Sequence, residues 1–234
     1  MHGRIAVRLA RRGVRGIVAG MILSRQRRYL FIHIPKTGGT AMALALEGRA
    51  ARDDLMLGDT PKARQRRGRL KGVQTHGRLW KHSTLADLEG LVSVDEAADL
   101  FIFTLVRNPW DRAVSYYHWL REQTFDHPAV ERARALPFDA FLRDPATRAA
   151  FRATPARSYV STADGVERCA HFIRLERFEE DAGPLWDHLG FRLSLDRTNV
   201  SARDRDYRGY YSDDLARIVA RDCEEDIARF GYAY

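Results

Sequence analysis

Residues 29–40 read YLFIHIPKTGGT, and this stretch decides the fold. Tyr29 to Ile34 is a mostly apolar run rich in aromatic and β-branched residues, which predicts a buried strand. Pro35 to Thr40 interrupts that run with two glycines, and Ala41 to Leu46 then supplies good helix formers. We therefore expect a strand, a glycine loop and a helix in direct succession.

The loop has the composition of an anion site. Gly38 and Gly39 allow close backbone approach to a ligand, and the helix that follows presents unpaired N–H groups at its first turn. Thr37 and Thr40 add hydroxyl groups, and Lys36 adds a positive charge. The order is not that of the Walker A motif, in which lysine follows the glycines. The alternative is a glycine turn that only caps a helix.

A second stretch repeats the pattern some seventy residues later. Leu100 to Val106 is another strand of apolar residues, and it ends at Arg107. Asn108 is a good N-cap, Pro109 suits a first helical turn, and Trp110 to Glu122 has helical spacing. The sequence thus predicts a helix that begins directly after this strand.

Arg107 and Ser115 are candidates for a second anion site. An arginine can hold a phosphate with two parallel hydrogen bonds. On the predicted helix, Ser115 shares a face with Asp111 and His118, away from the apolar stripe, so we expect its hydroxyl to be available to a ligand. The alternative is an exposed serine and an arginine paired with a neighbouring carboxylate.

The remaining elements complete an α/β pattern. A third strand is expected over residues 171–175, with short elements at 73–75 (strand) and 85–91 (helix), and helices over 138–142, 182–189 and 212–230. Strands that alternate with helices predict a single α/β domain with a central, mainly parallel sheet flanked by helices. We place a basic N-terminal segment at residues 1–28 and the folded domain at 29–234.

The bulk composition restricts the function only broadly. The 234 residues carry a formal net charge of +8, which fits an anionic ligand, a nucleic acid or an acidic membrane surface. No stretch reaches the length of a membrane span, and the basic N-terminus is interpreted either as a peripheral membrane contact or as a loosely ordered tail. Cys169 and Cys223 lack metal-ligand spacing and are expected to be reduced thiols, with one disulfide between them as the alternative.

Together, FIHIPKTGGT (31–40) and LVRNPWDRAVSYYHW (105–119) resemble the PAPS-dependent sulfotransferases, in particular the carbohydrate sulfotransferase branch. PAPS is 3′-phosphoadenosine 5′-phosphosulfate. The resemblance implies a P-loop-like sulfotransferase fold. It also implies that Lys36, Thr37, Gly38, Gly39 and Thr40 bind the 5′-phosphosulfate, and that Arg107 and Ser115 bind the 3′-phosphate.

The resemblance extends to LERFEED (175–181) and to the tail from Asn199 to Tyr234. Basic loops in that tail close over the adenosine 3′-phosphate in related enzymes, which makes Arg203 a further candidate for the donor site. Many relatives carry serine after the loop threonine, whereas this chain has Ala41, so one hydroxyl donor is missing.

The resemblance also implies the catalytic roles. Lys36 would stabilise the leaving group, and no metal is required. The general base would be His82, within KHSTLADL (81–88), with His76 as the competing candidate and a glutamate as a further alternative.

The implied acceptor is a hydroxyl group, on a carbohydrate or glycan, and not a nucleic acid. A cytoplasmic enzyme with peripheral membrane contact through its N-terminus fits this assignment, which leaves the oligomeric state undefined. Two other functions remain open: a P-loop-type kinase, which predicts magnesium-dependent ATP binding, and a non-enzymatic polyanion-binding protein, which predicts binding that weakens steeply with salt.

Overall fold

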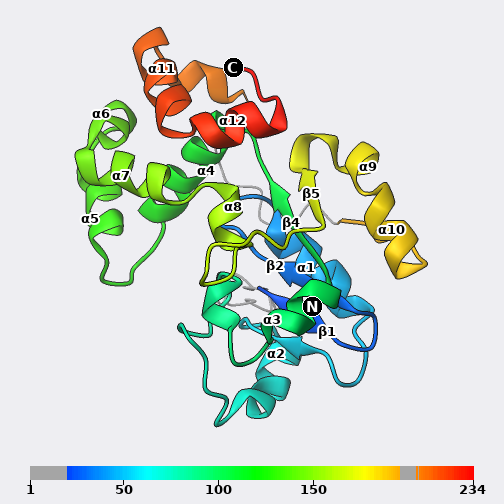
Figure 1. Ribbon diagram of the computed structural model, residues 1–234. Helices are drawn as coiled ribbons and strands as arrows, with labels where there is room; N and C mark the ends of the chain where they lie inside the picture. Colours follow the sequence, from blue (N-terminus) through cyan, green and yellow to red (C-terminus); the bar gives the residue numbers. More distant parts are fainter. Residues whose placement is uncertain (1–19, 196–203, 205) are drawn as a thin grey trace, which may run out of the picture.

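The computed structural model describes residues 20–195, 204 and 206–234. A five-stranded sheet runs through the centre in the order β3-β1-β2-β4-β5 (Figure 1). Its strands are β1 (Ile22–Ser24), β2 (Tyr29–Ile32), β3 (Leu55–Met56), β4 (Phe101–Val106) and β5 (His171–Arg174). The expected α/β domain with a central sheet flanked by helices is confirmed.

The sheet is mixed. β2, β4 and β5 are parallel, with Tyr29 opposite Phe101 and Phe103 opposite His171. β1 and β3 extend the β2 edge in antiparallel pairing. These two strands were not predicted. The sequence analysis placed the start of the folded domain at Tyr29, whereas β1 begins the sheet earlier, at Ile22.

The described helices surround this sheet, and α5, α6 and α7 form a lobe at one side (Figure 1). The α-helices are α1 (Gly39–Gly48), α2 (Pro61–Arg66), α3 (Val94–Asp99), α4 (Pro109–Arg121), α5 (Pro128–Ala135), α6 (Phe138–Arg143), α7 (Pro145–Ala153), α8 (Ala156–Tyr159), α9 (Phe178–Asp181), α10 (Gly183–Leu189), α11 (Asp213–Asp222) and α12 (Glu224–Phe230). Short 3₁₀ turns are η1 (Arg67–Leu70), η2 (Ala86–Leu88), η3 (Leu175–Arg177) and η4 (Tyr207–Tyr210).

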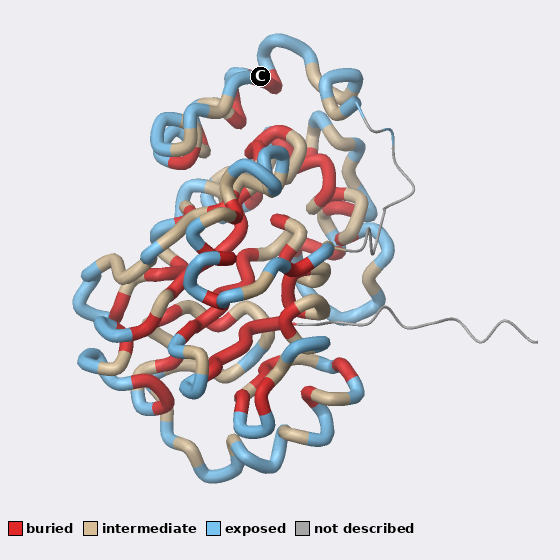
Figure 2. Tube along the Cα trace, turned by 90° about the vertical axis from the view of Figure 1, so that its right-hand side faces the viewer, coloured by how far each residue is buried: buried red, intermediate tan, exposed pale blue. Residues whose placement is uncertain are grey.

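Alternation along the strands produces the two faces of the sheet. Phe31 and Phe103 pack with Met42 of α1 and Trp186 of α10 in one apolar cluster. Their sequence neighbours point the other way, and Ile32 joins a second cluster with residues of η2, α3 and α8. Figure 2 shows this as buried chain through the middle, with exposed loops around it. Both faces are covered, which is why β2 and β4 are almost entirely apolar, with Thr104 as the polar exception.

A third cluster belongs to helices alone. Trp110 and Tyr117 of α4 pack with Phe141 of α6 and Leu215 of α11, and the Trp110 indole donates to the carbonyl of Ala216 at 2.9 Å. This cluster joins α4 to α5, α6 and α11. The lobe of α5–α7 is thus held against the helix that follows β4.

Several local predictions need correction. Residues 73–75 form no strand, and 85–91 contains only the 3₁₀ turn η2. The helix expected over 212–230 divides at Cys223 into α11 and α12, and α2 lies in a part of the chain where no helix was predicted. Cys169 and Cys223 are both free thiols. Within the described residues, no helix is long and apolar enough to cross a bilayer.

Candidate functional site

The predicted loop lies between β2 and α1. Gly38 has φ +86° in the left-handed region and stands at the N-cap, without a side-chain hydrogen bond to cap the helix. Its carbonyl accepts from the N–H groups of Ala41 and Met42, which starts the ten-residue helix α1. The first-turn N–H groups carry the positive end of the helix dipole, so the loop is suited to hold an anion.

Lys36 adopts a backbone conformation that lysine rarely takes. Its φ of +67° lies in the left-handed region, where a side chain with Cβ is strained by about 1–2 kcal/mol. Its ammonium lies 5.4 Å from the ring centroid of Trp119 in α4, and the Lys81 ammonium lies 5.6 Å from the same centroid. Burial lowers the pKa of Lys81. Two ammonium groups thus meet on one indole, and this concentrates positive charge beside the loop.

The two loop threonines are placed differently. Thr37 is almost fully buried, and its hydroxyl donates to the carbonyl of Ile34 at 2.9 Å. Its side chain therefore fixes the shape of the loop. Thr40 is half-buried in the first turn of α1.

Arg107 reaches the loop from the end of β4. Its Nη1 donates to the carbonyl of Lys36 at 3.2 Å, while Nε and Nη2 both donate to Asp111 Oδ2 at 2.9 and 2.5 Å. The parallel pairing of β2 with β4 produces this meeting, because the carboxyl ends of parallel strands lie at the same edge of the sheet. The ion pair with Asp111 was the alternative considered for Arg107, and it coexists with the contact to the loop.

Ser115 is less accessible than the sequence predicted. It is only 5% exposed, and α4 buries residues on most of its circumference. His118, from the same predicted polar face, packs edge-on against Tyr210 at 5.3 Å between ring centroids. The helix packs against the loop as well as against α5, α6 and α11, and a single apolar stripe accounts for only part of this contact.

Sequence reasoning missed the groups that hold the second motif in place. The backbone N–H of Asn108 donates to Glu176 Oε1 at 2.7 Å, and the Asn108 side-chain amide donates to the Tyr207 hydroxyl at 3.3 Å. Tyr232 Oη donates to the other Glu176 oxygen at 3.3 Å. Glu176 lies in LERFEED, whose resemblance to a family segment was the available signal. Arg203, the remaining donor-site candidate, lies outside the described residues.

His82 is the histidine that the structure brings to the loop. Its Nδ1 lies 2.8 Å from the carbonyl of His33, and the two imidazoles are 4.5 Å apart between centroids. A carbonyl only accepts, so Nδ1 carries the hydrogen and the lone pair of the neutral ring is on Nε2. His76, by contrast, is exposed, and its backbone N–H donates to the carbonyl of Glu89.

The pKa of His82 is lowered to about 3. Burial is the largest cause; the contact with the His33 carbonyl opposes it, and the charges of Lys81, Arg112 and Lys36 add to the lowering. His82 is therefore neutral at physiological pH and lies within the field of the loop lysine. A bound anion would offset those three cations and raise this pKa.

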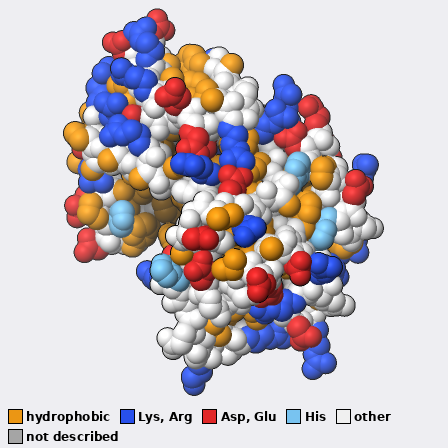
Figure 3. Space-filling view, in the orientation of Figure 1, with side chains coloured by type: hydrophobic (Ala, Val, Ile, Leu, Met, Phe, Trp, Pro, Cys, Tyr) orange, Lys and Arg blue, Asp and Glu red, His pale blue; other side chains and the backbone are white. Residues whose placement is uncertain are grey.

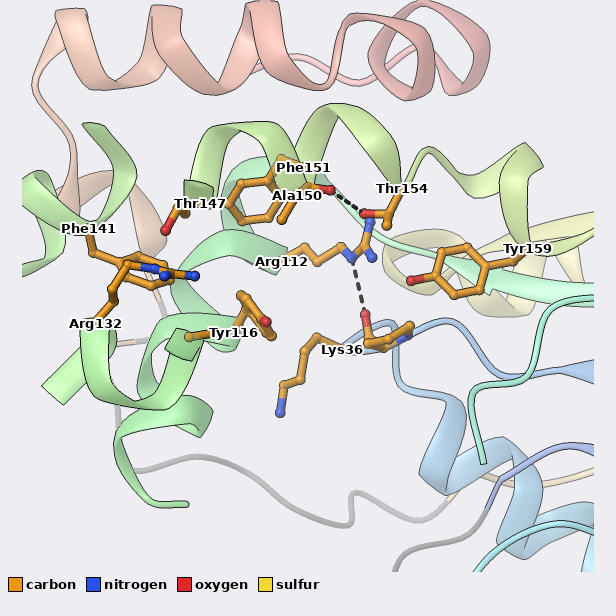
Figure 4. A pocket seen from close by; sticks show the side chains of 12 residues that line it. Lys36, Arg112, Tyr116, Arg132, Phe141, Thr147, Ala150, Phe151, Thr154 and Tyr159 are labelled. Carbon is orange, nitrogen blue, oxygen red and sulfur yellow. Dashed lines mark hydrogen bonds between the residues drawn. The ribbon is translucent and has the colours of Figure 1, made fainter. Parts of the chain in front are cut away.

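A cavity opens beside the loop. Its volume is about 140 Å³, and it lies between Lys36 and helices α4–α8 (Figure 4). The lining residues are Pro35, Lys36, Arg112, Tyr116, Ala129, Arg132, Phe141, Thr147, Ala150, Phe151, Thr154 and Tyr159. In Figure 3 the surface is hollowed beside the α5–α7 lobe, with apolar side chains in the hollow. Sequence reasoning named only Lys36 among these residues as part of a site.

Gly39→Ala is expected to lower stability by about 1–3 kcal/mol through overpacking. A Cβ at Gly39 would lie 2.1 Å from Cδ2 of His33, which is itself only 3% exposed, so the imidazole under the loop has to move. Thermal unfolding measures the effect. Gly48→Ala is the matched control at the other end of α1, where an added Cβ meets nothing within 4 Å. Equal melting temperatures for the two variants would contradict the tight contact.

No protein-family model and no curated protein matches this chain. Among solved structures, the chain is similar to mouse sulfotransferase SULT7A1 complexed with PAP, at 15% sequence identity and a TM-score of 0.43. That similarity covers 88% of this chain and 85% of the mouse chain. What this chain does therefore rests on the residues of its own site.

Proposed function

We propose that this protein transfers a sulfuryl group from PAPS to an acceptor hydroxyl. One observation carries the proposal: the Arg107 guanidinium donates to the carbonyl of Lys36, so the two predicted anion-binding motifs meet at one edge of the sheet. Either motif alone has an ordinary structural explanation. The two motifs lie together, and His82 packs against His33, the residue that comes just before the loop. This arrangement favours a site for a ligand with two separate anionic groups.

The donor would lie with its 5′-phosphosulfate on the loop and its 3′-phosphate near Arg107. Gly38 and Gly39 allow the backbone to approach the 5′ end, and the start of α1 offers N–H donors there. Arg107 keeps Asp111 as a partner, and a guanidinium with five donors can hold a phosphate as well. Ser115 and Arg203 are proposed to complete the 3′ site, on the family resemblance.

The reaction would be an in-line displacement at sulfur. A new bond forms between sulfur and the acceptor oxygen as the bond from sulfur to the 5′-phosphate oxygen breaks. The acceptor proton passes to Nε2 of His82, and 3′-phosphoadenosine 5′-phosphate (PAP) leaves with the electron pair. Lys36 stabilises the negative charge that develops on the leaving oxygen, in the manner of phosphoryl transfer.

The acceptor is less closely defined by the motifs. They resemble those of enzymes that sulfate carbohydrates, and on that ground the acceptor would be a sugar or glycan hydroxyl. The cavity beside Lys36 favours another acceptor, because its walls are mostly apolar. We propose that the enzyme is cytoplasmic. The basic N-terminal segment, proposed for membrane contact, lies mainly outside the described residues.

Arg107→Ala is expected to weaken PAP binding by about ten- to hundred-fold, the effect of losing a hydrogen bond to a charged group. Calorimetric titration with PAP, without magnesium, measures this directly, with ATP as the competing ligand. The wild type is expected to bind PAP without metal and to prefer it over ATP. Arg107→Lys should recover only part of the affinity, because lysine lacks the planar fork.

Arg121→Ala is the matched control, since Arg121 is an exposed arginine at the far end of the same helix. It is expected to bind PAP like the wild type. Preference for magnesium-ATP by a folded wild type would replace the proposal with a kinase. Equal loss of affinity in Arg107→Ala and Arg121→Ala would instead indicate a general polyanion surface, and binding would then fall steeply with salt.

A further inference from the structure

The segment that follows β5 lies against both motifs of the candidate site. Val106 of β4 is opposite Arg174 of β5, so the residues that follow the two strands leave the sheet at the same edge. Leu175 packs on the loop, because a Cβ added at Gly38 would lie 2.7 Å from its Cδ1. The next residue, Glu176, contacts the second motif. One short turn after β5 therefore contacts the loop and the second motif together.

Glu176 holds the peptide bond that joins Arg107 to Asn108. Its Oε1 accepts from the Asn108 N–H at 2.7 Å, and its Oε2 accepts from the Tyr232 hydroxyl at 3.3 Å. Tyr232 is itself fixed to α12, because its backbone N–H donates to the carbonyl of Ile227 at 3.1 Å. The carboxylate is thus held in a defined orientation between the second motif and the segment that follows α12.

The side chain of Asn108 is also engaged with the protein. Its Oδ1 accepts from the N–H groups of Trp110 and Asp111. Its Nδ2 donates to the Tyr207 hydroxyl at 3.3 Å and to the Ala233 carbonyl at 3.2 Å. These first N–H groups of α4 are therefore satisfied within the protein, and a phosphate beside them depends on side chains for its donors.

We propose that Glu176 is a positioning residue for the 3′-phosphate of the donor. This inference rests on the proposed sulfuryl transfer. Arg107 can hold the phosphate only where its backbone places it, and Glu176 fixes the peptide that follows Arg107. A carboxylate in direct contact with the phosphate would repel it, so a favourable effect of Glu176 on donor binding is transmitted through Asn108.

The test compares PAP with adenosine 5′-phosphate (AMP), which lacks the 3′-phosphate, by calorimetric titration. Glu176→Ala is expected to weaken PAP binding by about two- to tenfold, the effect of one net hydrogen bond, and to leave AMP binding unchanged. A general loss of structure would weaken both nucleotides alike. The ratio of PAP affinity to AMP affinity is therefore a readout that a merely structural residue would not move.

Two further variants complete the design. Glu176→Gln keeps an oxygen that can accept from the Asn108 N–H, and it is expected to restore the wild-type ratio. Glu179→Ala removes a carboxylate from an exposed position of α9, three residues further along the same segment. It is expected to leave the ratio unchanged, because it alters the charge of the segment without altering the contact to the second motif.

Hydrogen exchange measured by mass spectrometry tests the same contact without a nucleotide. The peptide that contains residues 108–111 is expected to exchange faster in Glu176→Ala than in the wild type, because the start of α4 loses its anchor. Glu176→Gln is expected to keep the wild-type protection. Thermal unfolding of each variant checks that the rest of the protein is folded.

Four results would overturn the inference: an unchanged ratio in Glu176→Ala, tighter PAP binding by that variant, an equal loss in Glu176→Gln, or unchanged exchange of residues 108–111. Failure of the donor assignment has a different signature, since the wild type would then not bind PAP, while hydrogen exchange still reports whether Glu176 holds the start of α4. The positioning role and the proposed donor therefore fail separately.

Discussion

Lys36→Gly is expected to slow sulfuryl transfer by about 10²- to 10³-fold and to leave the melting temperature within a few degrees of the wild type. The kinetic loss is that of one preorganised donor aimed at developing charge. Rapid-quench measurement of a single turnover at saturating PAPS checks the rate, and calorimetric or optical melting checks the stability.

The near-constant stability follows from the backbone. At φ +67°, lysine carries about 1–2 kcal/mol of strain, which glycine removes. Against this, glycine adds about 0.4–1 kcal/mol of unfolded-chain entropy, and the contact with Trp119 contributes about 0.5–1 kcal/mol. These terms nearly cancel. A strained lysine where glycine fits as well indicates that the ammonium group is needed for another purpose.

Arg28→Gly is the matched control, because Arg28 is also non-glycine at a positive φ, of +53°, in the turn between β1 and β2. It is expected to change stability by a similar amount and to leave the transfer rate unaltered. If Lys36→Gly kept the wild-type rate, Lys36 would have no part in the chemistry. If it unfolded the protein, the ammonium group would be structural.

The sequence predicted the central part of the fold because its signals are long and local. β2 and β4 are mostly apolar runs buried on both faces, and each leads through a short connection into its helix. Asn108 caps α4 as expected, with Oδ1 accepting from the N–H groups of Trp110 and Asp111. Because β2 and β4 are parallel neighbours, Arg107 lies beside the loop. Predicting this contact required only that the two strands be adjacent in the sheet.

What escaped prediction depends on distant contacts. β1 is three residues long and is followed by basic residues, so its pairing with β2 leaves no periodicity to detect. The lobe of α5–α7, together with α8, contributes most of the cavity lining, and its aromatic residues have the spacing of ordinary core positions. Ser115 was misjudged because α4 is packed on more than one side, which a single helical stripe does not indicate.

His82→Asn is expected to lower the transfer rate by about 10²- to 10⁴-fold, the usual contribution of a general base. Asparagine can still donate a hydrogen bond toward the His33 carbonyl, as Nδ1 of His82 does at 2.8 Å, but it offers no basic nitrogen. PAP affinity should therefore stay near that of the wild type. Steady-state kinetics at saturating donor and a PAP titration separate the two effects.

The matched control is His76→Asn, since His76 is exposed and its backbone pairs with Glu89 away from the loop. It is expected to transfer sulfuryl groups at the wild-type rate. The opposite result, a slow His76→Asn and a normal His82→Asn, would assign the base to His76. Normal rates in both variants would leave a carboxylate as the base.

The pKa of His82, lowered to about 3, also predicts how the transfer rate depends on pH. An ordinary histidine near 6.5 loses its base form as the pH falls through that value, whereas His82 stays neutral to far lower pH. The wild-type kcat/KM for the donor, which reports on the free enzyme, should therefore not decline between pH 8 and pH 5 through this group. A decline centred near pH 6.5 would contradict a buried, neutral His82.

The lowered pKa of His82 also determines how the stability of the protein changes with pH. Between about pH 6.5 and pH 3, the unfolded chain binds a proton on His82 that the folded chain does not. The unfolding free energy therefore decreases as the pH falls below 6.5 and reaches its lower limit near the folded pKa. His82→Asn removes this contribution. The variant should lose less stability than the wild type between pH 7 and pH 4, as measured by urea unfolding, and an equal loss would show that His82 takes up its proton while folded.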